Sequence, residues 1–496
     1  MNIMMLLEMA AEAFGDRVAI GDKSKGMTYA ELAEKSGKTA AWLREQNADR
    51  LIYVDESAPT LPVSLFGSSW AGKPFVPVSY RLQADRLNTL IERQAPAVVV
   101  GGANVASVVN AANGLQILTN AAFAAAWNGS TPPSADWSSE PEDIAVLLHT
   151  SGTSGDPKIA VLRQRHLVSY VLGSCEFMSA EEDEASLVSV PPYHIAGISA
   201  MLTGVYQGRR IVQLPAFEEN EWVRLAREQE ITHAMVVPTM LARILEVLED
   251  GKGLPSLRHL SYGGGRMPLP IIERAMELIP NVNFVNAYGL TETSSSIAIL
   301  GPDDHRDAMA SDDPAVRKRL GSVGRPLPSV EITIRDEDGN EVATGTSGEV
   351  WVRGEQVSGE YAKQGSTSSD EGWFQTKDGG YFDEGGFLFV EGRIDDVIVK
   401  GGENLSPGEI EDVLLDHPTV REVCVVGLPD VEWGEIVAAV IVPADGSKCD
   451  DEELKQWVAK HLRSSRVPAL FEYRIELPYN DTGKVLRRVI REELKK

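Results

Sequence analysis

The sequence predicts an α/β protein with more than one folding unit. Short β-branched runs, such as residues 97–100 (AVVV) and 211–214 (IVQL), alternate with segments of helical spacing through the first 300 residues. Strands separated by helices are typical of parallel sheets that are covered on both faces. At roughly 150 residues per domain, a chain of 496 residues is long enough for two to four units.

Further elements follow from the same periodicity. Strands are expected at residues 187–190 and 234–237, and helices at residues 82–93 and 220–229. Residues 94–127 carry no charge, but asparagine, glutamine and glycine interrupt them. They contain no run of about 20 apolar residues, so we expect a buried strand–helix–strand piece there rather than a membrane span.

The pattern changes after about residue 320. Residues 330–335 (VEITIR) and 348–353 (GEVWVR) alternate on either side of a turn, which predicts a small antiparallel β unit. A charged segment at residues 392–396 (GRIDD) then precedes a mixture of strands and helices, which ends in a basic helix at residues 485–496. We place a domain boundary near residues 392–395.

Charge and cysteine content exclude several classes of protein. Lys and Arg total 47 against 73 Asp and Glu, so the net charge is −26. This balance argues against nucleic acid as a partner and against stable membrane association. Cys175, Cys424 and Cys449 lack CxxC spacing, which disfavours a disulfide framework or a thiolate zinc site. Residues 1–17 predict an amphipathic helix without a basic leader, and we expect a cytoplasmic protein.

The segment HTSGTSGDPK, residues 149–158, has the composition of a phosphate-binding loop. Hydroxyls and exposed backbone N–H groups suit a polyphosphate, and a lysine adds a point charge. It is not a Walker A loop, because the G-K-[ST] ending is absent, and an ordinary Ser/Gly-rich loop is the alternative. The candidate phosphate loop consists of Thr150, Ser151, Gly152, Thr153, Ser154, Gly155 and Lys158.

Two later segments have chemistry that suits a nucleotide. The three glycines of YGGGR, residues 262–266, let a flat ring approach the backbone closely, or they form a flexible turn. In NAYGLTET, residues 286–293, Tyr288 can stack on a ring, and Thr291 and Glu292 suit phosphate and Mg²⁺. A polar helix start is the alternative for the second segment.

Two single side chains complete the candidates. Asp378 lies in a Gly-rich segment, where it can accept hydrogen bonds from ribose hydroxyls or form an Asx turn. Lys484, in YNDTGK, is expected on a tight turn before the basic helix, where a solvated surface lysine is the usual explanation.

Taken together, these motifs resemble those of the adenylate-forming acyl-CoA synthetase superfamily, which includes luciferases and peptide-synthetase adenylation domains. HTSGTSGDPK, NAYGLTET, GWFQTKDGGYFDEGGFLFVEGRIDD, KGGENLSPGEIE and NDTGK occur in the family's order and spacing. The resemblance covers nearly the whole chain. It implies a large N-terminal domain of two α/β subdomains plus a small β-barrel (1–391), a hinge (392–395) and a small mobile α+β C-terminal domain (396–496).

The resemblance also implies roles for single residues. The candidate phosphate loop would wrap the β- and γ-phosphates of ATP, and Thr291 would contact the α-phosphate. Glu292 would bind Mg²⁺, and Asp378 and Arg393 would contact the ribose. The residues implied to surround the adenine are Gly263, Gly264, Gly265, Ala287, Tyr288 and Gly289.

The remaining implied roles concern catalysis and CoA. Lys484 resembles the catalytic lysine that bridges the substrate carboxylate and the α-phosphate, and Asp395 falls at the family's hinge. His194 falls near the junction of the acyl site and the thiol tunnel, although a lone histidine among apolar residues is as often a core residue. The implied CoA-tunnel residues are Gly401, Gly402 and Glu403.

The implied activity is that of an AMP-forming carboxylic acid–CoA ligase that uses ATP, Mg²⁺ and CoA. A stand-alone enzyme that loads a carrier protein and a nucleotide-binding regulator without catalysis are the alternatives, and a luciferase-like oxygenase has less support. Amino acid substrates are disfavoured, because relatives that bind them carry Asp where this chain has His194. The small, apolar and hydroxyl side chains expected around the pocket suit a short-to-medium aliphatic, alicyclic or aromatic acid.

Four positions depart from the family pattern. Ser154 keeps a hydroxyl where Thr is common, and Ile159 replaces the usual Gly after the lysine. Lys377 stands where Gly is common, and Arg266 stands where a small residue is usual. We interpret Ile159 and Lys377 as changes that alter nucleotide affinity, and Arg266 as a polar end of the substrate pocket.

Overall fold

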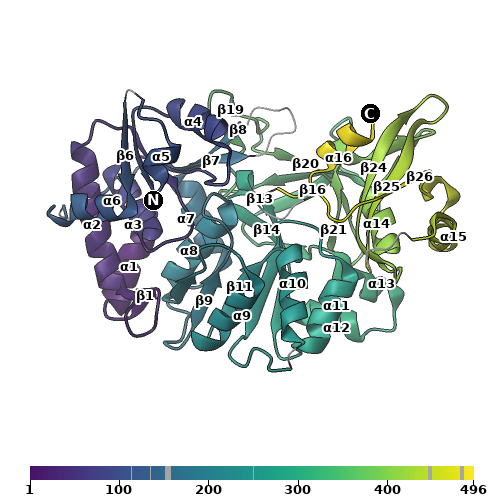
Figure 1. Cartoon of the computed structure of the whole chain (residues 1–496), viewed down its shortest axis with the longest axis horizontal. Helices are drawn as coiled ribbons and strands as arrows, with labels where there is room; N and C mark the ends of the chain where they lie inside the picture. The colour runs from purple at the N-terminus through teal and green to yellow at the C-terminus, as the bar shows by residue number, and fades with distance from the viewer. Residues whose placement is uncertain are drawn as a thin grey trace.

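The computed structural model describes residues 1–112, 114–133, 136–150, 158–249, 251–444, 449–480 and 485–495. Figure 1 shows a large N-terminal part with two sheets and their covering helices, followed by a small C-terminal domain. The expected α/β class is therefore confirmed. Among the described residues, no helix has the length and apolar character needed to cross a membrane.

The first sheet is built mainly from the N-terminal third of the chain. Its strands are β3 (Arg50–Val54), β4 (Phe75–Pro77), β5 (Ala97–Gly101), β6 (Leu115–Thr119), β7 (Ile144–Thr150), β8 (Lys158–Arg163), β18 (Glu360–Tyr361) and β19 (Gly365–Ser366). Their order is β19-β18-β8-β7-β4-β3-β5-β6. The pairs from β7 to β6 are parallel, whereas β7 and β8 are antiparallel neighbours. The candidate phosphate loop thus joins two adjacent strands.

The second sheet carries the nucleotide motifs. Its strands are β1 (Val18–Ile20), β2 (Met27–Thr28), β9 (Ala185–Val188), β10 (Arg210–Gln213), β11 (His233–Val236), β12 (His259–Gly263), β13 (Asn283–Leu290), β14 (Ser295–Leu300) and β15 (Arg325–Pro326). The order is β15-β14-β13-β12-β11-β9-β10-β1-β2, with parallel pairing from β13 to β1. In the structure, the strands begin one or two residues before their predicted positions. Polar residues such as Arg210 and His233 also pair with the neighbouring strand.

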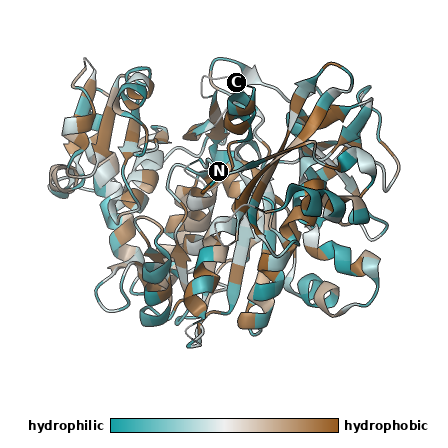
Figure 2. Ribbon diagram, turned by 45° about the vertical axis from the view of Figure 1, so that its right-hand side comes forward, coloured by the Kyte–Doolittle hydropathy of each residue, from teal (hydrophilic) through white to brown (hydrophobic). Residues whose placement is uncertain are grey.

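Helices cover both sheets and fill the space between them. They are α1 (Met4–Phe14), α2 (Tyr29–Glu45), α3 (Thr60–Ala71), α4 (Ala84–Glu92), α5 (Val105–Val108), α6 (Asn120–Asn128), α7 (Gln164–Ser174), α8 (Ile195–Gln207), α9 (Glu219–Glu228), α10 (Pro238–Leu248), α11 (Leu269–Leu278), α12 (Pro302–Ala310) and α13 (Pro314–Arg317). One core joins Phe66 of α3, Val146 of β7, Ile198 of α8 and Ile211 of β10, so these helices tie the two sheets together. Figure 2 shows hydrophobic residues concentrated along the strands.

Local sequence signals explain several boundaries. The helix α2 begins with a capping box, in which Thr28 accepts from the Glu31 N–H and Glu31 accepts from the Thr28 N–H. The helix α3 ends at Gly72, whose φ of 72° is left-handed and suits a residue without a Cβ. The uncharged segment 94–127 contains the expected strand–helix–strand order, β5-α5-β6, with α6 following.

A small antiparallel sheet precedes the C-terminal domain. Its strands, in spatial order, are β16 (Glu331–Arg335), β17 (Gly348–Arg353), β20 (Phe374–Phe382) and β21 (Leu388–Arg393). It lies in the part of the chain where the resemblance implied a β-barrel. A short turn, η3 (Ile394–Asp396), then leads into the C-terminal domain.

The C-terminal domain has a core of its own. It contains β22 (Ile398–Lys400), β23 (Glu403–Leu405), α14 (Pro407–Leu415), β24 (Val420–Asp430), β25 (Gly434–Pro443), α15 (Asp451–His461), β26 (Leu470–Tyr473) and α16 (Arg487–Leu494). Ile410, Val425, Ile441 and Leu454 are fully buried against one another in this core. The helices pack on a sheet in which β24 and β25 form a long hairpin.

Candidate nucleotide site

The glycine strip and the aromatic motif lie side by side at the carboxyl ends of β12 and β13. These strands are parallel neighbours, and Gly263 pairs with Ala287. A Cβ at Gly263 would overlap the Ala287 carbonyl oxygen, and Gly264 has a φ of 77°, which favours glycine. Ligands of open α/β sheets bind at this end of the strands.

Glu292 lies directly after β13, in a short turn, η1 (Thr291–Thr293). Its side chain is buried, and Oε1 accepts a hydrogen bond of 2.5 Å from the Tyr361 hydroxyl. The N–H groups of Ser358 and Gly359 donate to the Glu292 carbonyl oxygen at 2.8 and 3.3 Å. Residues 358–361 therefore hold Glu292 through both its backbone and its carboxylate.

Tyr361 joins Glu292 to the strand that follows the candidate phosphate loop. It lies on β18, pairs with Ala160 of β8, and its ring centre is 5.0 Å from the Lys158 Nζ. Burial and the nearby Glu292 charge raise the pKa of the Tyr361 phenol, so its hydroxyl stays protonated and donates. Sequence reasoning missed Tyr361, because an isolated tyrosine in SGEYAK carries no motif signal.

The ribose candidates form a second connected group. Asp378 lies within β20, opposite Arg393 of β21, and not in the turn that the sequence suggested. Its Oδ2 accepts from the Tyr288 hydroxyl at 2.6 Å, and its Oδ1 accepts from the Arg393 Nη1 at 3.3 Å. The same Arg393 nitrogen donates to the Thr376 carbonyl oxygen at 2.8 Å. The structure thus brings the ring, the carboxylate and the guanidinium together.

Left-handed backbone flanks both acids. Ser294 and Ser295 have φ values of 57° and 122°, and Lys377, beside Asp378, has a φ of 64°. Such conformations are costly for residues with a Cβ and persist where the surrounding structure holds them. A residue without a Cβ would adopt this backbone conformation at position 377 at a lower cost than Lys377 does.

Other predicted residues have different surroundings. His194 precedes α8, and its ring lies 4.7 Å from the Tyr193 ring. Farther along α8, the Ser199 hydroxyl lies 3.1 Å from the Ser295 hydroxyl, so this helix reaches the segment after Glu292. Ile159 lies on β8 and packs into an apolar core cluster.

The residues implied for the CoA tunnel lie on the hairpin of β22 and β23. Gly401, Gly402 and Glu403 are exposed, and the Gly401 N–H donates to the Trp433 carbonyl oxygen of the same domain at 2.8 Å. Asp395 is exposed in η3. The predicted residues Ser151, Gly152, Thr153, Ser154, Gly155 and Lys484 lie outside the described residues.

Arg266 contacts the C-terminal domain in this structure. Its guanidinium forms an ion pair with Asp412 of α14, in the C-terminal domain. That Arg266 marks a polar end of the substrate pocket stays a prediction.

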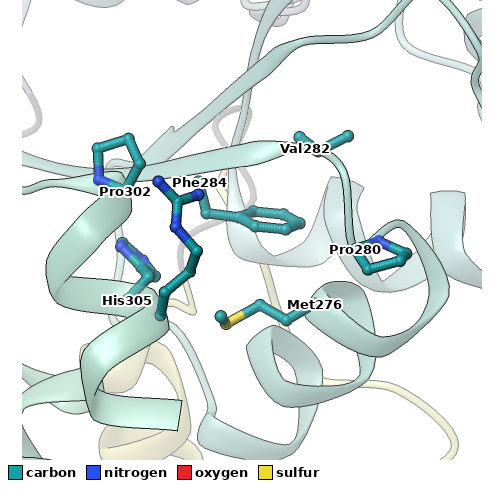
Figure 3. Close-up of a pocket in the computed structure, with 7 residues that line it drawn as sticks. Met276, Pro280, Val282, Phe284, Pro302 and His305 are labelled. Carbon is teal, nitrogen blue, oxygen red and sulfur yellow. The ribbon is translucent and has the colours of Figure 1, made fainter. Parts of the chain in front are cut away.

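Figure 3 shows a pocket that is separate from this site. It is lined by Met276, Pro280, Val282, Phe284, Pro302, His305 and Arg306. Val282 directly precedes β13 and Phe284 is its second residue, whereas the nucleotide motif lies at the other end of the strand. His305 is part of the packing here, because its Nε2 lies 2.8 Å from the Tyr262 hydroxyl and burial lowers its pKa to about 4.

The Glu292 carboxylate suits a metal ion that is bound by the protein and the substrate together. Among the described residues, no group of three or more His, Cys, Asp and Glu side chains is placed to hold a metal ion. Mg²⁺ is usually bound by one or two carboxylates together with substrate phosphates. A buried carboxylate next to the phosphate-loop strands fits that mode.

Family models match most of the chain. The model of the AMP-binding enzyme family matches residues 7–362, and that of the AMP-binding enzyme C-terminal domain matches residues 409–484. The chain belongs to the AMP-binding enzyme family. The resemblance to adenylate-forming enzymes, drawn from the motifs, is confirmed.

Similar members of the AMP-binding enzyme family span the same length. A 2-succinylbenzoate–CoA ligase from Bacillus licheniformis is 31% identical over 97% of this chain and 98% of its own. A fatty acid–[acyl-carrier-protein] ligase from Streptomyces coeruleorubidus is 31% identical over 95% and 92%. The o-succinylbenzoate CoA synthetase from Bacillus subtilis, solved with its acyl-adenylate OSB-AMP, is 28% identical, with a TM-score of 0.84 over 99% and 98%.

Replacement of Asp378 by alanine is expected to weaken ATP binding. The variant loses the carboxylate that is expected to accept from the ribose hydroxyls, and hydrogen bonds to charged groups contribute about 1.5–3 kcal/mol. We expect the KM for ATP to rise about tenfold to a hundredfold. Tyr288→Phe is the matched control, because it removes only the internal hydrogen bond. An equal rise in both variants would assign Asp378 a purely structural role.

Proposed function

We propose that this chain activates a carboxylic acid with ATP and transfers it, as an acyl-adenylate, to the thiol of CoA. The arrangement that carries the proposal is the Glu292–Tyr361–Lys158 group beside the Tyr288–Asp378–Arg393 group, in a chain of the AMP-binding enzyme family. The first group suits a polyphosphate, and the second suits a nucleoside. The chain is thus an AMP-forming acid–thiol ligase.

The first half-reaction is a displacement at the α-phosphorus. A carboxylate oxygen of the acid forms the new P–O bond, and the bond to pyrophosphate breaks. Lys484 neutralises the carboxylate and the α-phosphate, Thr291 donates to the α-phosphate, and the candidate phosphate loop holds the leaving group. Magnesium, held by Glu292, would neutralise charge on the phosphates.

The second half-reaction is acyl transfer. The thiol loses its proton to solvent, its sulfur attacks the acyl carbon, and the bond to the AMP oxygen breaks, so that AMP leaves. We propose that the C-terminal domain (396–496) rotates against the N-terminal domain (1–391) about Asp395, in the hinge 392–395. Rotation withdraws Lys484 and brings Gly401, Gly402 and Glu403 to the site, where glycine leaves room for the pantetheine arm. His194 then lies near the junction of the acyl site and the thiol tunnel.

The acid is expected to be short to medium in length, and aromatic acids come first in a substrate panel. One similar protein is named for 2-succinylbenzoate, and another, from Amycolatopsis, is named feruloyl-CoA synthase. The net charge of −26 and the absence of a CxxC motif support a cytoplasmic protein without nucleic acid as a partner.

Transfer to a carrier protein is the second candidate. Its support is the similar protein named fatty acid–[acyl-carrier-protein] ligase. In that case the phosphopantetheine arm of the carrier replaces that of CoA. A regulator without catalysis has less support, because both Glu292 and Lys484 are present.

Lys484→Ala separates the two half-reactions. We expect acid-dependent pyrophosphate release to fall about a hundredfold or more, because a charge that stabilises the transition state is lost. Conversion of preformed acyl-adenylate and CoA into thioester should remain near the wild-type rate. Equal loss of both reactions would contradict the proposed rotation of the C-terminal domain between them.

A further inference from the structure

One ion pair joins the nucleotide strip to the C-terminal domain. Arg266 directly follows the three glycines, and its guanidinium contacts the Asp412 carboxylate on α14. The two side chains are 41% and 29% exposed, so the pair is partly shielded from water. A Cβ at Gly408 would overlap the Arg266 guanidinium, which shows that this side chain lies along one turn of α14.

A buried ion pair and a backbone hydrogen bond hold the helix α14 to the rest of the C-terminal domain. Glu411, next to Asp412, is buried and forms a two-pronged ion pair with Arg487. The Val425 N–H donates to the same carboxylate at 2.7 Å. Arg487 begins α16, three residues after Lys484, and its Nε lies 3.9 Å from the Asp396 carboxylate beside the hinge. A restraint on Asp412 therefore acts on the body that carries Lys484.

The same orientation leaves the proposed thiol loop in solvent. Gly401, Gly402 and Glu403 are exposed, and so is the apolar Trp433, which contacts Gly401. A loop that faces solvent cannot guide a pantetheine arm to the nucleotide strip. The orientation in which Arg266 meets Asp412 is thus not the one proposed for acyl transfer.

We propose that Arg266 and Asp412 form a positioning pair that holds the C-terminal domain in the orientation for adenylate formation and opens before acyl transfer. This inference rests on the proposed function. Both residues act on Lys484 through the domain and contact neither substrate.

The charges around Asp412 support this assignment. Burial raises the pKa of Asp412 to about 6, the Arg266 charge opposes that shift, and Glu411, Asp416 and Glu409 add to it. Arg266 is thus the charge that stabilises the ionised Asp412 among neighbouring acids. Loss of either partner makes this orientation less favourable relative to an open one.

The test compares both half-reactions in Arg266→Ala and Asp412→Asn. We expect acid-dependent pyrophosphate release to fall about threefold to tenfold, as for the loss of a partly exposed ion pair. Thioester formation from preformed acyl-adenylate should stay equal or increase. Arg274→Ala is the matched control, because Arg274 pairs with Glu249 within the N-terminal domain and is 43% exposed. Unchanged pyrophosphate release in both variants, or an equal fall in both half-reactions, would overturn the proposal.

A charge reversal distinguishes positioning from a general loss of folding. The double variant Arg266→Asp/Asp412→Arg should recover most of the pyrophosphate release that Arg266→Asp alone loses.

In the double variant Arg266→Cys/Asp412→Cys, cross-linking with a short bis-maleimide should preserve single-turnover adenylate formation and block thioester formation. If the charge reversal does not recover pyrophosphate release, the proposal that these two residues act as a pair is wrong. Absence of both half-reactions in the wild-type protein would instead overturn the proposed function, and the accessibility of the two cysteines to cross-linking would still test the contact.

Discussion

Glu292→Gln is expected to reduce adenylate formation about a hundredfold to a thousandfold, as the loss of a preorganised electrostatic group does. Glutamine keeps the shape of the side chain and can still accept the 2.5 Å hydrogen bond from Tyr361. It removes the negative charge that suits Mg²⁺, a hard cation with a preference for carboxylate oxygen. The effect therefore reports on charge rather than on packing. Acid-dependent pyrophosphate release, measured over a range of Mg²⁺ concentrations, checks this prediction.

Tyr361→Phe is the matched control for Glu292→Gln. It removes the hydrogen bond but keeps both the carboxylate and the ring near Lys158, so its effect should be smaller and its Mg²⁺ dependence weaker. A Glu292→Gln variant with the wild-type rate and the wild-type Mg²⁺ dependence would show that the metal is held elsewhere.

Arg487→Met is expected to destabilise the C-terminal domain by about 3 kcal/mol, because it leaves the buried Glu411 carboxylate without its charged partner. The Val425 N–H still donates to Glu411, but one neutral donor does not offset the cost of a buried charge. Hydrogen exchange is the suitable measurement, because it localises the loss of protection to α14 and β24. The N-terminal domain should keep its wild-type protection.

The double variant Glu411→Gln/Arg487→Met should recover part of this stability. Glutamine can still accept from Val425, and no buried charge remains without a partner. If the double variant is destabilised by the sum of the two single effects, Glu411 and Arg487 do not act as a pair. A loss of protection spread evenly over both domains would contradict the separate core of the C-terminal domain.

The sequence predicted the helices and strands in which buried residues recur at a regular spacing. Strands such as β5 and β17 and helices such as α9 were found within two residues of their predicted positions, because one face of each must be buried. Asp378 was placed in a turn because glycines surround it, yet these glycines belong to a bulged strand, β20. Composition alone does not separate a bulge from a turn.

Contacts between distant segments were not predictable from the sequence. Tyr361 meets Glu292 across 69 residues, and Arg266 meets Asp412 across 146 residues. Neither pair lies at a spacing that strands or helices impose, since the contact depends on how two sheets or two domains pack. Tyr288 and Asp378 could be placed at one site only through the resemblance, and the structure supplies their hydrogen bond.

The most direct test of the central claim is release of pyrophosphate and AMP with Mg²⁺ and ATP, across a panel of carboxylic acids, with and without CoA. We expect acid-dependent release of pyrophosphate, with AMP and thioester formed only when CoA is added. Pyrophosphate without CoA turnover would instead indicate a carrier-protein acceptor. Absence of acid-dependent pyrophosphate with every class of acid, from a protein that still binds ATP, would contradict the account.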